Sequence, residues 1–318
     1  MNTTGTEWDV VVVGGGSAGL SAALMLGRSR RRVLVVDGSR PRNAVAAHMH
    51  GVLGRDHTSP VDLLAEGRAE LARYDVTVET GSTAASAVAL DDGEEPRFEV
   101  VLDSGERHTA RRVLVTTGLV DELPEIPGLA EQWGRGVVIC PYCDGWEVRD
   151  RRIAVIAAAT LDTRQAQLMR QLTESVTFYA NGATVSDPGR RELAARGIAI
   201  DEREVVAVIG GEDGVLSGIR LADGSEEPAD AVFVAPRAAP NNTLLHDLRA
   251  RTMRSGGIEW VLVDDDGRTS VRGVYAAGNV VSAKSSVPWA MASGSMAGAA
   301  INADLVDEDV RSAVAAQS

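Results

Sequence analysis

The hydrophobic pattern near the start of the chain alternates between the periods of a buried strand and of a helix. An apolar run follows Asp9 and leads into a glycine-rich turn. Leu20, Ala23 and Leu24 then recur at helical spacing, and a second apolar run covers Val33 to Val36. Strand, helix and strand in this order predict a βαβ unit, and hence an α/β fold with a parallel sheet.

The same pattern recurs about 140 residues further along the chain. It predicts a strand at Ile153 to Ile156, a helix at Thr163 to Leu172 and a strand at Val176 to Tyr179. Two related units of this kind indicate two Rossmann-like, three-layer domains of the dinucleotide-binding type.

Shorter segments of alternating polarity follow each βαβ unit and predict antiparallel layers. In the first half they are Phe98 to Leu102 and Arg107 to Thr116. In the second half they are Val205 to Val208, Gly214 to Leu221 and Ala231 to Val234.

Two proline-containing segments, Pro124 to Pro127 and Ala235 to Asn242, are typical of crossings between domains. We therefore expect a discontinuous first domain, residues 1–119 and 240–318, and a second domain, residues 120–239.

Composition narrows the classes of partner. With 318 residues, of which 44% are hydrophobic, the chain can bury two cores, and its net charge of −13 argues against nucleic acid and anionic lipid. No run approaches the roughly 20 apolar residues of a membrane span, and the first residues do not resemble a signal peptide. We expect a cytoplasmic protein with no membrane partner.

The first glycine-rich turn carries a candidate cofactor site. Gly14, Gly16 and Gly19 have GxGxxG spacing between a strand and a helix, and Asp37 ends the next strand. The three glycines would serve the tight turn, the approach of the backbone to a pyrophosphate and the packing of helix on strand, while the acid would bind a ribose hydroxyl. This combination predicts a dinucleotide cofactor.

The only two cysteines, Cys140 and Cys143, form the motif CPYC followed by Asp144 and a glycine. In the cytosol a close pair is typical of redox chemistry, and at a helix start the backbone N–H groups lower the pKa of a thiol. A glutaredoxin-like domain, half of a metal site and an inert buried pair are the alternatives. We expect no metal, because no histidine is near in sequence and no second CxxC exists.

A second fingerprint, Gly273 to Asn279, and the segment Val113 to Gly118 complete the pattern. With the CPYC motif, they make the chain resemble the two-dinucleotide-domain flavoprotein disulfide reductases, and within them the thioredoxin reductase family. The resemblance implies FAD in the first domain, Cys143 facing the flavin, Cys140 exchanging with substrate and Asp144 as acid/base. The implied FAD contacts are Gly14, Gly16, Ser17, Ala18, Gly19, Asp37, Gly38, Asn43, Thr117, Gly118, Gly278, Asn279 and Val287.

The chain departs from the family at two places near the flavin. Asn279 stands where relatives carry an aspartate, and an amide can still donate and accept hydrogen bonds, so FAD is still expected. Val287 and Pro288 replace a polar contact at the start of a helix expected from about Trp289 to Leu305.

The second glycine-rich turn should hold NADPH, but it has lost its glycines. Ala157, Ala159 and Asp162 stand at the glycine or small-residue positions. The methyl groups fill space that a pyrophosphate needs, and the carboxylate repels it by about 4 kcal/mol, nearly three decades in affinity. Arg190 and Arg191 are interpreted as a solvated helix face. The sequence predicts poor or no binding of nicotinamide cofactors.

These features are similar to the dithiol oxidases that close disulfides in natural products such as gliotoxin, holomycin and romidepsin. The resemblance implies a small-molecule dithiol substrate, O2 as acceptor and a homodimer. His50 is a candidate base for a substrate thiol, and His48 is a weaker one. The alternatives are a reductase fed by ferredoxin or reduced flavin, and a non-redox flavin-binding module.

Overall fold

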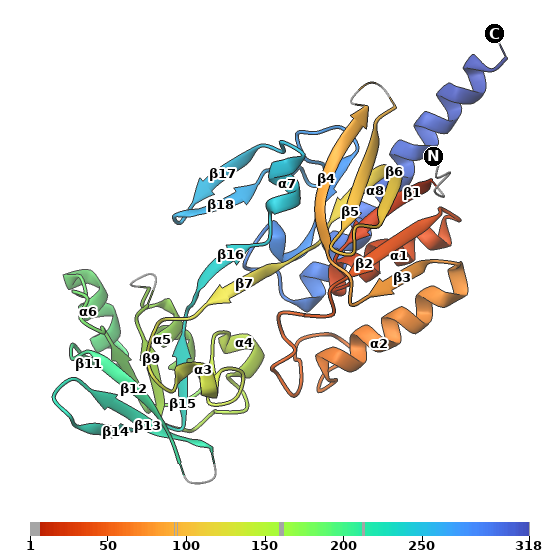
Figure 1. Cartoon of the computed structure of the whole chain (residues 1–318). Helices are drawn as coiled ribbons and strands as arrows, with labels where there is room; N and C mark the ends of the chain where they lie inside the picture. Colours follow the sequence, from red (N-terminus) through yellow and green to blue (C-terminus); the bar gives the residue numbers. More distant parts are fainter. Residues whose placement is uncertain (1–6, 92, 94, 159–161, 212–213, 318) are drawn as a thin grey trace. The chain divides into compact units, whose positions relative to one another are not determined.

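The computed structural model describes residues 7–91, 93, 95–158, 162–211 and 214–317 (Figure 1). They fall into two compact units. Unit 1 comprises Met1–Arg42, Val61–Val120 and Ala238–Ser318, and unit 2 comprises Asn43–Pro60 and Asp121–Arg237. The segment 43–60, expected in the first domain, therefore groups with unit 2, where Val45 packs against Gly134 and His50 approaches Glu147.

A seven-stranded sheet forms the centre of unit 1, in the order β3-β2-β1-β6-β5-β4, with β19 also paired to β6. Strands β1, β2, β3, β6 and β19 are parallel to one another. Strands β5 and β6 form the predicted antiparallel pair, and β4, which was not predicted, extends it to a three-stranded meander. The bounds are β1 Trp8–Val13, β2 Val33–Asp37, β3 Thr77–Thr80, β4 Ala84–Asp91, β5 Arg97–Leu102, β6 Arg107–Val115 and β19 Val274–Ala276.

The two faces of this sheet are covered by different layers. In β1, Val10 and Val12 point to a core shared with three helices, while Val11 and Val13 point to a core shared with β4, β5 and α7. Residues that alternate in this way are expected for a strand buried on both faces. The helices are α1 Ser17–Arg28, α2 Pro60–Leu71 and α8 Val287–Ala315 on one face, and α7 Thr243–Asp247 on the other. The predicted three-layer α/β architecture is confirmed.

Helix α8 packs closely on α1 because two glycines lie at the contact. A Cβ on Gly294 would lie 2.0 Å from the carbonyl oxygen of Ala18, and one on Gly298 would lie 2.7 Å from that of Ala22. Any larger residue would push the two backbones apart. The C-terminal helix is thereby held against the start of the first helix.

Unit 2 is built around a five-stranded parallel sheet in the order β11-β10-β9-β15-β8. Helices α5 and α6 share a core with one face, and an antiparallel β12-β13-β14 sheet with α3 shares a core with the other. The bounds are α3 Leu129–Gln132, β8 Val137–Val138, β9 Ile153–Ile156, α5 Arg164–Met169, β10 Val176–Tyr179, α6 Asp187–Ala195, β11 Ala199–Asp201, β12 Val205–Gly210, β13 Leu216–Leu221, β14 Glu226–Pro228 and β15 Ala231–Val234.

Three predicted elements differ from the structure. Ala231–Val234 is a parallel strand of the central sheet, not part of the antiparallel layer, because all four residues are buried on both faces. Helix α5 is shorter than predicted, and α8 extends ten residues beyond the predicted end at Leu305. The remaining elements are η1 Ala72–Tyr74, β7 Leu119–Glu122, α4 Pro141–Asp144, β16 Arg237–Pro240, β17 Thr252–Ser255, β18 Ile258–Val261 and η2 Gly278–Val280.

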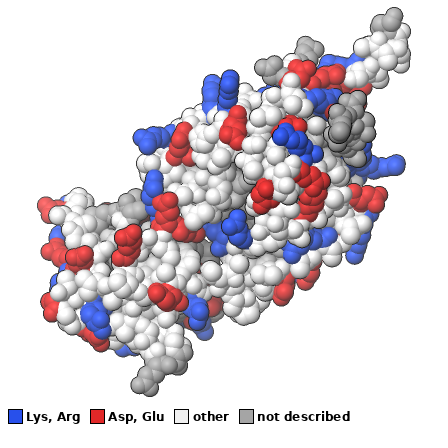
Figure 2. Space-filling model, in the orientation of Figure 1, with Lys and Arg blue, Asp and Glu red and all other residues white. Residues whose placement is uncertain are grey.

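The surface shows no concentration of one charge on the face that Figure 2 presents, where acidic and basic side chains are interspersed. This distribution agrees with a protein that lacks a basic nucleic-acid footprint on that face. Among the described residues, no helix combines the length and the hydropathy that a membrane span requires.

A buried charge cluster ties α8 to β6 in unit 1. Arg112 is fully buried, and its guanidinium lies 2.6 Å from Asp304 and 2.8 Å from Glu308. Glu308 is itself 1% exposed and also pairs with Arg111 and Arg97. Buried charges of this kind are tolerated only when each has its partner.

We expect Glu308→Ala to lower the free energy of unfolding by about 3 kcal/mol or more, because it removes one of the two carboxylates that pair with buried Arg112 and the partner that Arg112 shares with Arg111 and Arg97. Urea denaturation followed by circular dichroism measures the change. Glu99→Ala, which removes the partner of exposed Arg107, is the control and should cost under about 1 kcal/mol. Equally small losses in both variants would contradict this role of the cluster.

Candidate functional site

The glycine-rich turn of unit 1 has the geometry that a dinucleotide requires. Gly14 has a φ of 109° and a Cβ there would lie 2.4 Å from the carbonyl oxygen of Thr116, while a Cβ on Gly19 would lie 1.9 Å from that of Gly14. A Cβ on Gly16, in contrast, would meet nothing within 4 Å. Two glycines are thus required by packing, and the third leaves open space where a pyrophosphate would approach the start of α1.

Asp37 is held in a fixed orientation at the end of β2. It is 8% exposed, and its Oδ1 accepts hydrogen bonds from the backbone N–H groups of Gly15 at 3.3 Å and Ser39 at 3.1 Å. The second oxygen lies 3.8 Å from Arg68. An oriented carboxylate beside the glycine turn suits a ribose hydroxyl.

The second fingerprint surrounds η2, which follows β19. Gly278 has a φ of 76°, and the amide of Asn279 donates to the carbonyls of Ser282 and Ser285, both at 3.0 Å. A carboxylate could not donate these two bonds, so asparagine stabilises the loop in a way that an aspartate at this position could not. The side-chain oxygen of Asn279 remains able to accept a hydrogen bond.

The residues predicted to bind FAD divide between the two units. Unit 1 contains twelve of the thirteen, and Asn43 alone lies in unit 2. Within unit 1, Thr117 and Asn241 are joined by two hydrogen bonds beside Gly118, which has a φ of 70°. The open space at Gly16 and the oriented Asp37 fit a dinucleotide such as FAD. The unit 1 residues concerned are Gly14, Gly16, Ser17, Ala18, Gly19, Asp37, Gly38, Thr117, Gly118, Gly278, Asn279 and Val287.

The cysteine pair opens helix α4 in unit 2. Cys140 and Cys143 form a disulfide, Cys140 is the N-cap residue and Pro141 occupies the first helical turn. The backbone N–H of Cys143 donates to the Sγ of Cys140 at 3.1 Å. A donor aimed at this sulfur stabilises negative charge on it when the disulfide is reduced. Both cysteines are partly exposed, so a substrate can reach them.

Asp144 follows the pair directly and is partly buried. Burial, and after it the carboxylate of Glu147, raise the pKa of its carboxyl to about 6, although His50 opposes both. A carboxyl with this pKa both accepts and donates protons near neutral pH. Its position and its pKa suit the acid/base role that was predicted.

The structure brings His50 to the same region of unit 2. Its Nε2 lies 3.5 Å from Glu147 Oε1, its Nδ1 lies 3.3 Å from Asp56 Oδ1, and its side chain is 14% exposed. The ring of His57 packs edge-on against it at 4.6 Å. His48 is exposed, with its ring 5.5 Å from that of His57. Of the two predicted histidines, His50 is the one with carboxylate partners.

In the second turn, between β9 and α5, the side chain of Asp162 contacts the start of the helix. The carboxylate of Asp162 accepts a hydrogen bond from the backbone N–H of Arg164 at 2.8 Å, and so occupies a donor at the start of α5. Ala157 is buried, with its N–H bonded to the carbonyl of Tyr179. Ala159 lies outside the described residues.

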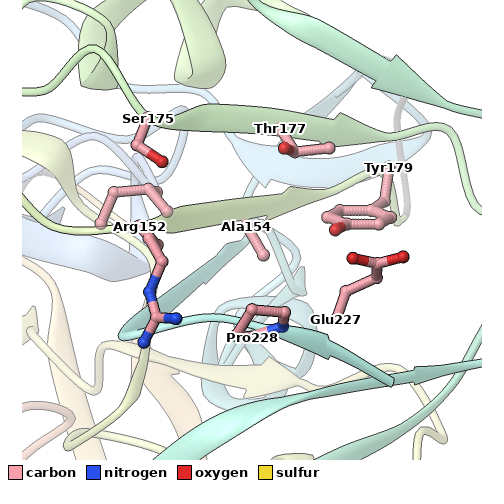
Figure 3. Close-up of a pocket in the computed structure, with 8 residues that line it drawn as sticks. Arg152, Ala154, Ser175, Thr177, Tyr179, Glu227 and Pro228 are labelled. Carbon is pink, nitrogen blue, oxygen red and sulfur yellow. The ribbon is translucent and has the colours of Figure 1, made fainter. Parts of the chain in front are cut away.

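A small pocket of about 120 Å³ in unit 2 contains none of the predicted site residues. Figure 3 shows Tyr179 beside Glu227 at one end and Arg152 at the other. Burial and the Glu227 carboxylate raise the pKa of Tyr179 to about 12, and Arg152 is paired with Asp230 at 2.6 Å. These groups are therefore unsuited to acid/base or redox chemistry near neutral pH.

Comparison with known proteins shows the class to which this fold and disulfide belong. Residues 8–297 match the family described as pyridine nucleotide-disulphide oxidoreductase. The chain therefore belongs to that family, as a thioredoxin reductase-like thiol/disulfide oxidoreductase. This confirms the predicted resemblance and favours an enzyme over a non-redox binding module.

Individual relatives match over nearly their whole length. Thioredoxin reductase tcpT of Claviceps purpurea (strain 20.1) is 35% identical over 91% of this chain and 92% of its own. Thioredoxin reductase sirT of Leptosphaeria maculans is 30% identical over 98% of both. The solved structure of HlmI is 42% identical with a TM-score of 0.93, over 99% of this chain and 97% of HlmI.

Three residues that contact His50 were missed by sequence reasoning. Asp56 and His57 lie in the same loop as His50, and Glu147 lies four residues after Cys143, just beyond the end of α4. The repeated histidines at 48, 50 and 57 were the available signal for the loop. Nothing in the sequence pairs that loop with the CPYC segment about 90 residues away.

Gly16→Ala tests the fit of a dinucleotide to unit 1. We expect it to change the stability of the fold by no more than about 1 kcal/mol, because its Cβ meets nothing, and to weaken flavin binding about tenfold or more, because the methyl group blocks the pyrophosphate. Flavin content and urea denaturation measure the two effects. Gly19→Ala should instead damage the fold itself, and unchanged flavin affinity in Gly16→Ala would contradict the assignment.

Asp144→Asn tests the environment of the carboxyl. Its pKa is about 6 in the folded state against an ordinary 3.8, so ionisation costs stability as the pH rises from about 4 to about 6, and the whole cost remains above that range. We expect Asp144→Asn to raise the melting temperature near pH 8, by the equivalent of about 1–2 kcal/mol, and to leave it unchanged near pH 4. Asp150→Asn, an exposed neighbour, is the control. An equal effect at both pH values would contradict the raised pKa.

Proposed function

We propose that the protein is an FAD-dependent dithiol oxidase. It converts a small-molecule dithiol to an intramolecular disulfide through Cys140 and Cys143, with O2 as the final acceptor and without NADPH. The observation that supports oxidation of the substrate, rather than its reduction by NADPH, is the altered turn between β9 and α5. There Asp162 occupies the helix start where the pyrophosphate of a nicotinamide cofactor would bind.

The exchange begins when a substrate thiolate attacks the Sγ of Cys140. A mixed disulfide forms, the Cys140–Cys143 bond breaks and Cys143 leaves as a thiolate. The second substrate thiolate then attacks the substrate sulfur of the mixed disulfide, which closes the product disulfide and releases Cys140. The hydrogen bond from the Cys143 N–H stabilises Cys140 as this leaving thiolate. The substrate loses two electrons and two protons, and the electrons remain on the cysteine pair.

Two side chains near the pair manage the protons. Asp144, with its pKa of about 6, accepts a proton from a substrate thiol, and His50 serves as a second base held between Asp56 and Glu147. The substrate loses its two thiol protons in separate steps, so Asp144 and His50 can each accept one of them. These roles go beyond what the family assignment establishes.

FAD would be held by the glycine turn, Asp37 and the η2 loop of unit 1, and when bound it would supply a two-electron acceptor that O2 reoxidises with formation of hydrogen peroxide. The net reaction is therefore dithiol and O2 to disulfide and hydrogen peroxide. Open space at Gly16 supports this cofactor.

Charged residues of α6 and β11 in unit 2 also bear on the proposed absence of an NADPH site. Arg190, which could serve a 2′-phosphate, forms an ion pair with Glu202 and donates to the carbonyl of Val185. The Glu202 carboxylate competes with a phosphate for this cation, although an exposed ion pair is worth only about 0–1 kcal/mol. Asp201, at the end of β11, is paired with Arg203 at 2.6 Å.

A second candidate is a reductase that receives electrons from ferredoxin or reduced flavin. The relatives tcpT and sirT are named thioredoxin reductases, which favours the reductase direction. The same cysteine chemistry would then run in reverse. A homodimer and a cytoplasmic location stay predictions.

Anaerobic reduction of the purified yellow protein separates the candidates. NADPH should leave the flavin absorbance unchanged over minutes, whereas a small dithiol such as dithiothreitol should bleach it. Cys140→Ser should abolish bleaching by dithiol, because the attacked sulfur is gone. Rapid bleaching by NADPH would overturn the oxidase, and bleaching by reduced ferredoxin or free reduced flavin, with none by dithiol, would favour the second candidate.

A further inference from the structure

A cluster of metal-ligating side chains lies in unit 2, formed by His50, His57 and Glu147. One nitrogen of each histidine and one carboxylate oxygen all lie within 4.8 Å of one another. His57 and Glu147 are exposed, and His50 is nearly buried beneath them. In the proposed oxidation His50 acts as a base that Glu147 helps to hold, and His57 has no role.

The separation between the ligand atoms suits a shared cation better than a direct hydrogen bond. His50 Nε2 and Glu147 Oε1 are 3.5 Å apart, beyond the ordinary range of about 2.7–3.2 Å for a hydrogen bond. Two ligands of a tetrahedral ion, each about 2.1 Å from the metal, lie roughly 3.4 Å apart. The observed distance therefore needs little adjustment to accommodate an ion.

Asp56 supplies the outer support that a metal-binding histidine needs. Its Oδ1 lies 3.3 Å from His50 Nδ1 and accepts the backbone N–H of Gly51 at 3.1 Å. A proton on Nδ1, the nitrogen that faces this carboxylate, leaves the lone pair on Nε2, which lies 3.5 Å from Glu147 Oε1. A carboxylate behind a histidine in this way is the usual arrangement at zinc sites, where it sets the tautomer and the ring orientation.

Backbone hydrogen bonds within the loop bring His50 and His57 close together. The N–H of His57 donates to the carbonyl of Met49 at 3.1 Å, and the N–H of Met49 donates to that of Thr58 at 2.9 Å, so the two ends of the loop are tied together. His57 has a φ of 64°, a left-handed conformation that histidine adopts more readily than most residues. The tie and this turn of the backbone place the His57 ring edge-on to that of His50.

We propose that His50, His57 and Glu147 bind a divalent transition-metal cation, with zinc the best match to two imidazoles and one carboxylate. Water completes the coordination, since three protein ligands leave a fourth position open. Binding takes His50 out of use as a base and places two positive charges near Asp144. Bound zinc should therefore inhibit the proposed oxidation. This inhibition rests on the proposed function, whereas the binding of zinc does not depend on it.

Calorimetric titration of the oxidised holoprotein with zinc chloride tests the site. The disulfide leaves no thiolate to compete for the metal, and we expect one equivalent of zinc per chain. His57→Asn, which keeps a residue suited to the left-handed backbone, should weaken binding at least tenfold, and Asp56→Asn should weaken it less. His246→Asn replaces an exposed histidine of α7 in unit 1 and should change nothing.

A second readout connects the site to activity. Without zinc, His57→Asn should oxidise dithiothreitol at the wild-type rate, and with zinc it should resist an inhibition that the wild type suffers at the same metal and dithiol concentrations. Absence of a one-equivalent site, or binding unaffected by His57→Asn, would overturn the proposal. If zinc binds as expected but no dithiol is oxidised, the metal site stands and the proposed oxidase activity is wrong.

Discussion

The chemistry depends on one hydrogen bond at the start of a short helix. Because Cys140 is the N-cap of α4, its sulfur lies where the N–H of Cys143 can donate to it. The two sulfurs therefore differ in their surroundings although they are three residues apart. One is prepared to carry negative charge, and Asp144, whose carboxyl has a pKa of about 6, follows immediately and in the proposed mechanism accepts the proton.

The two units use related folds for different tasks. In unit 1 the turn after β1 keeps open space at Gly16 and an oriented acid at Asp37. In unit 2 the equivalent helix start is occupied by the Asp162 carboxylate, while the parallel sheet and its covering layers remain intact. A sheet stabilised by its buried faces tolerates changes in its loops, so the fold does not depend on whether a loop keeps a cofactor site.

Local pattern was enough to predict the strands of the two βαβ units, including Ile153–Ile156 and Val176–Tyr179, since continuous apolar runs report burial on both faces. It failed for Ala231–Val234, because which sheet a strand joins is decided by long-range pairing. The same limit applies to the site. CPYC and Asp144 are contiguous in the chain, whereas the approach of His50 to Glu147 depends on where the 43–60 segment packs.

The unequal surroundings of the two sulfurs can be measured directly. After reduction by excess dithiol in the absence of oxygen and anaerobic removal of the reductant, the protein is treated near neutral pH, still without oxygen, with less than one equivalent of iodoacetamide, and labelled peptides are quantified by mass spectrometry. The hydrogen bond to the Sγ of Cys140 predicts that Cys140 is labelled several times faster than Cys143. Preferential labelling of Cys143, or equal labelling of both, would contradict the account.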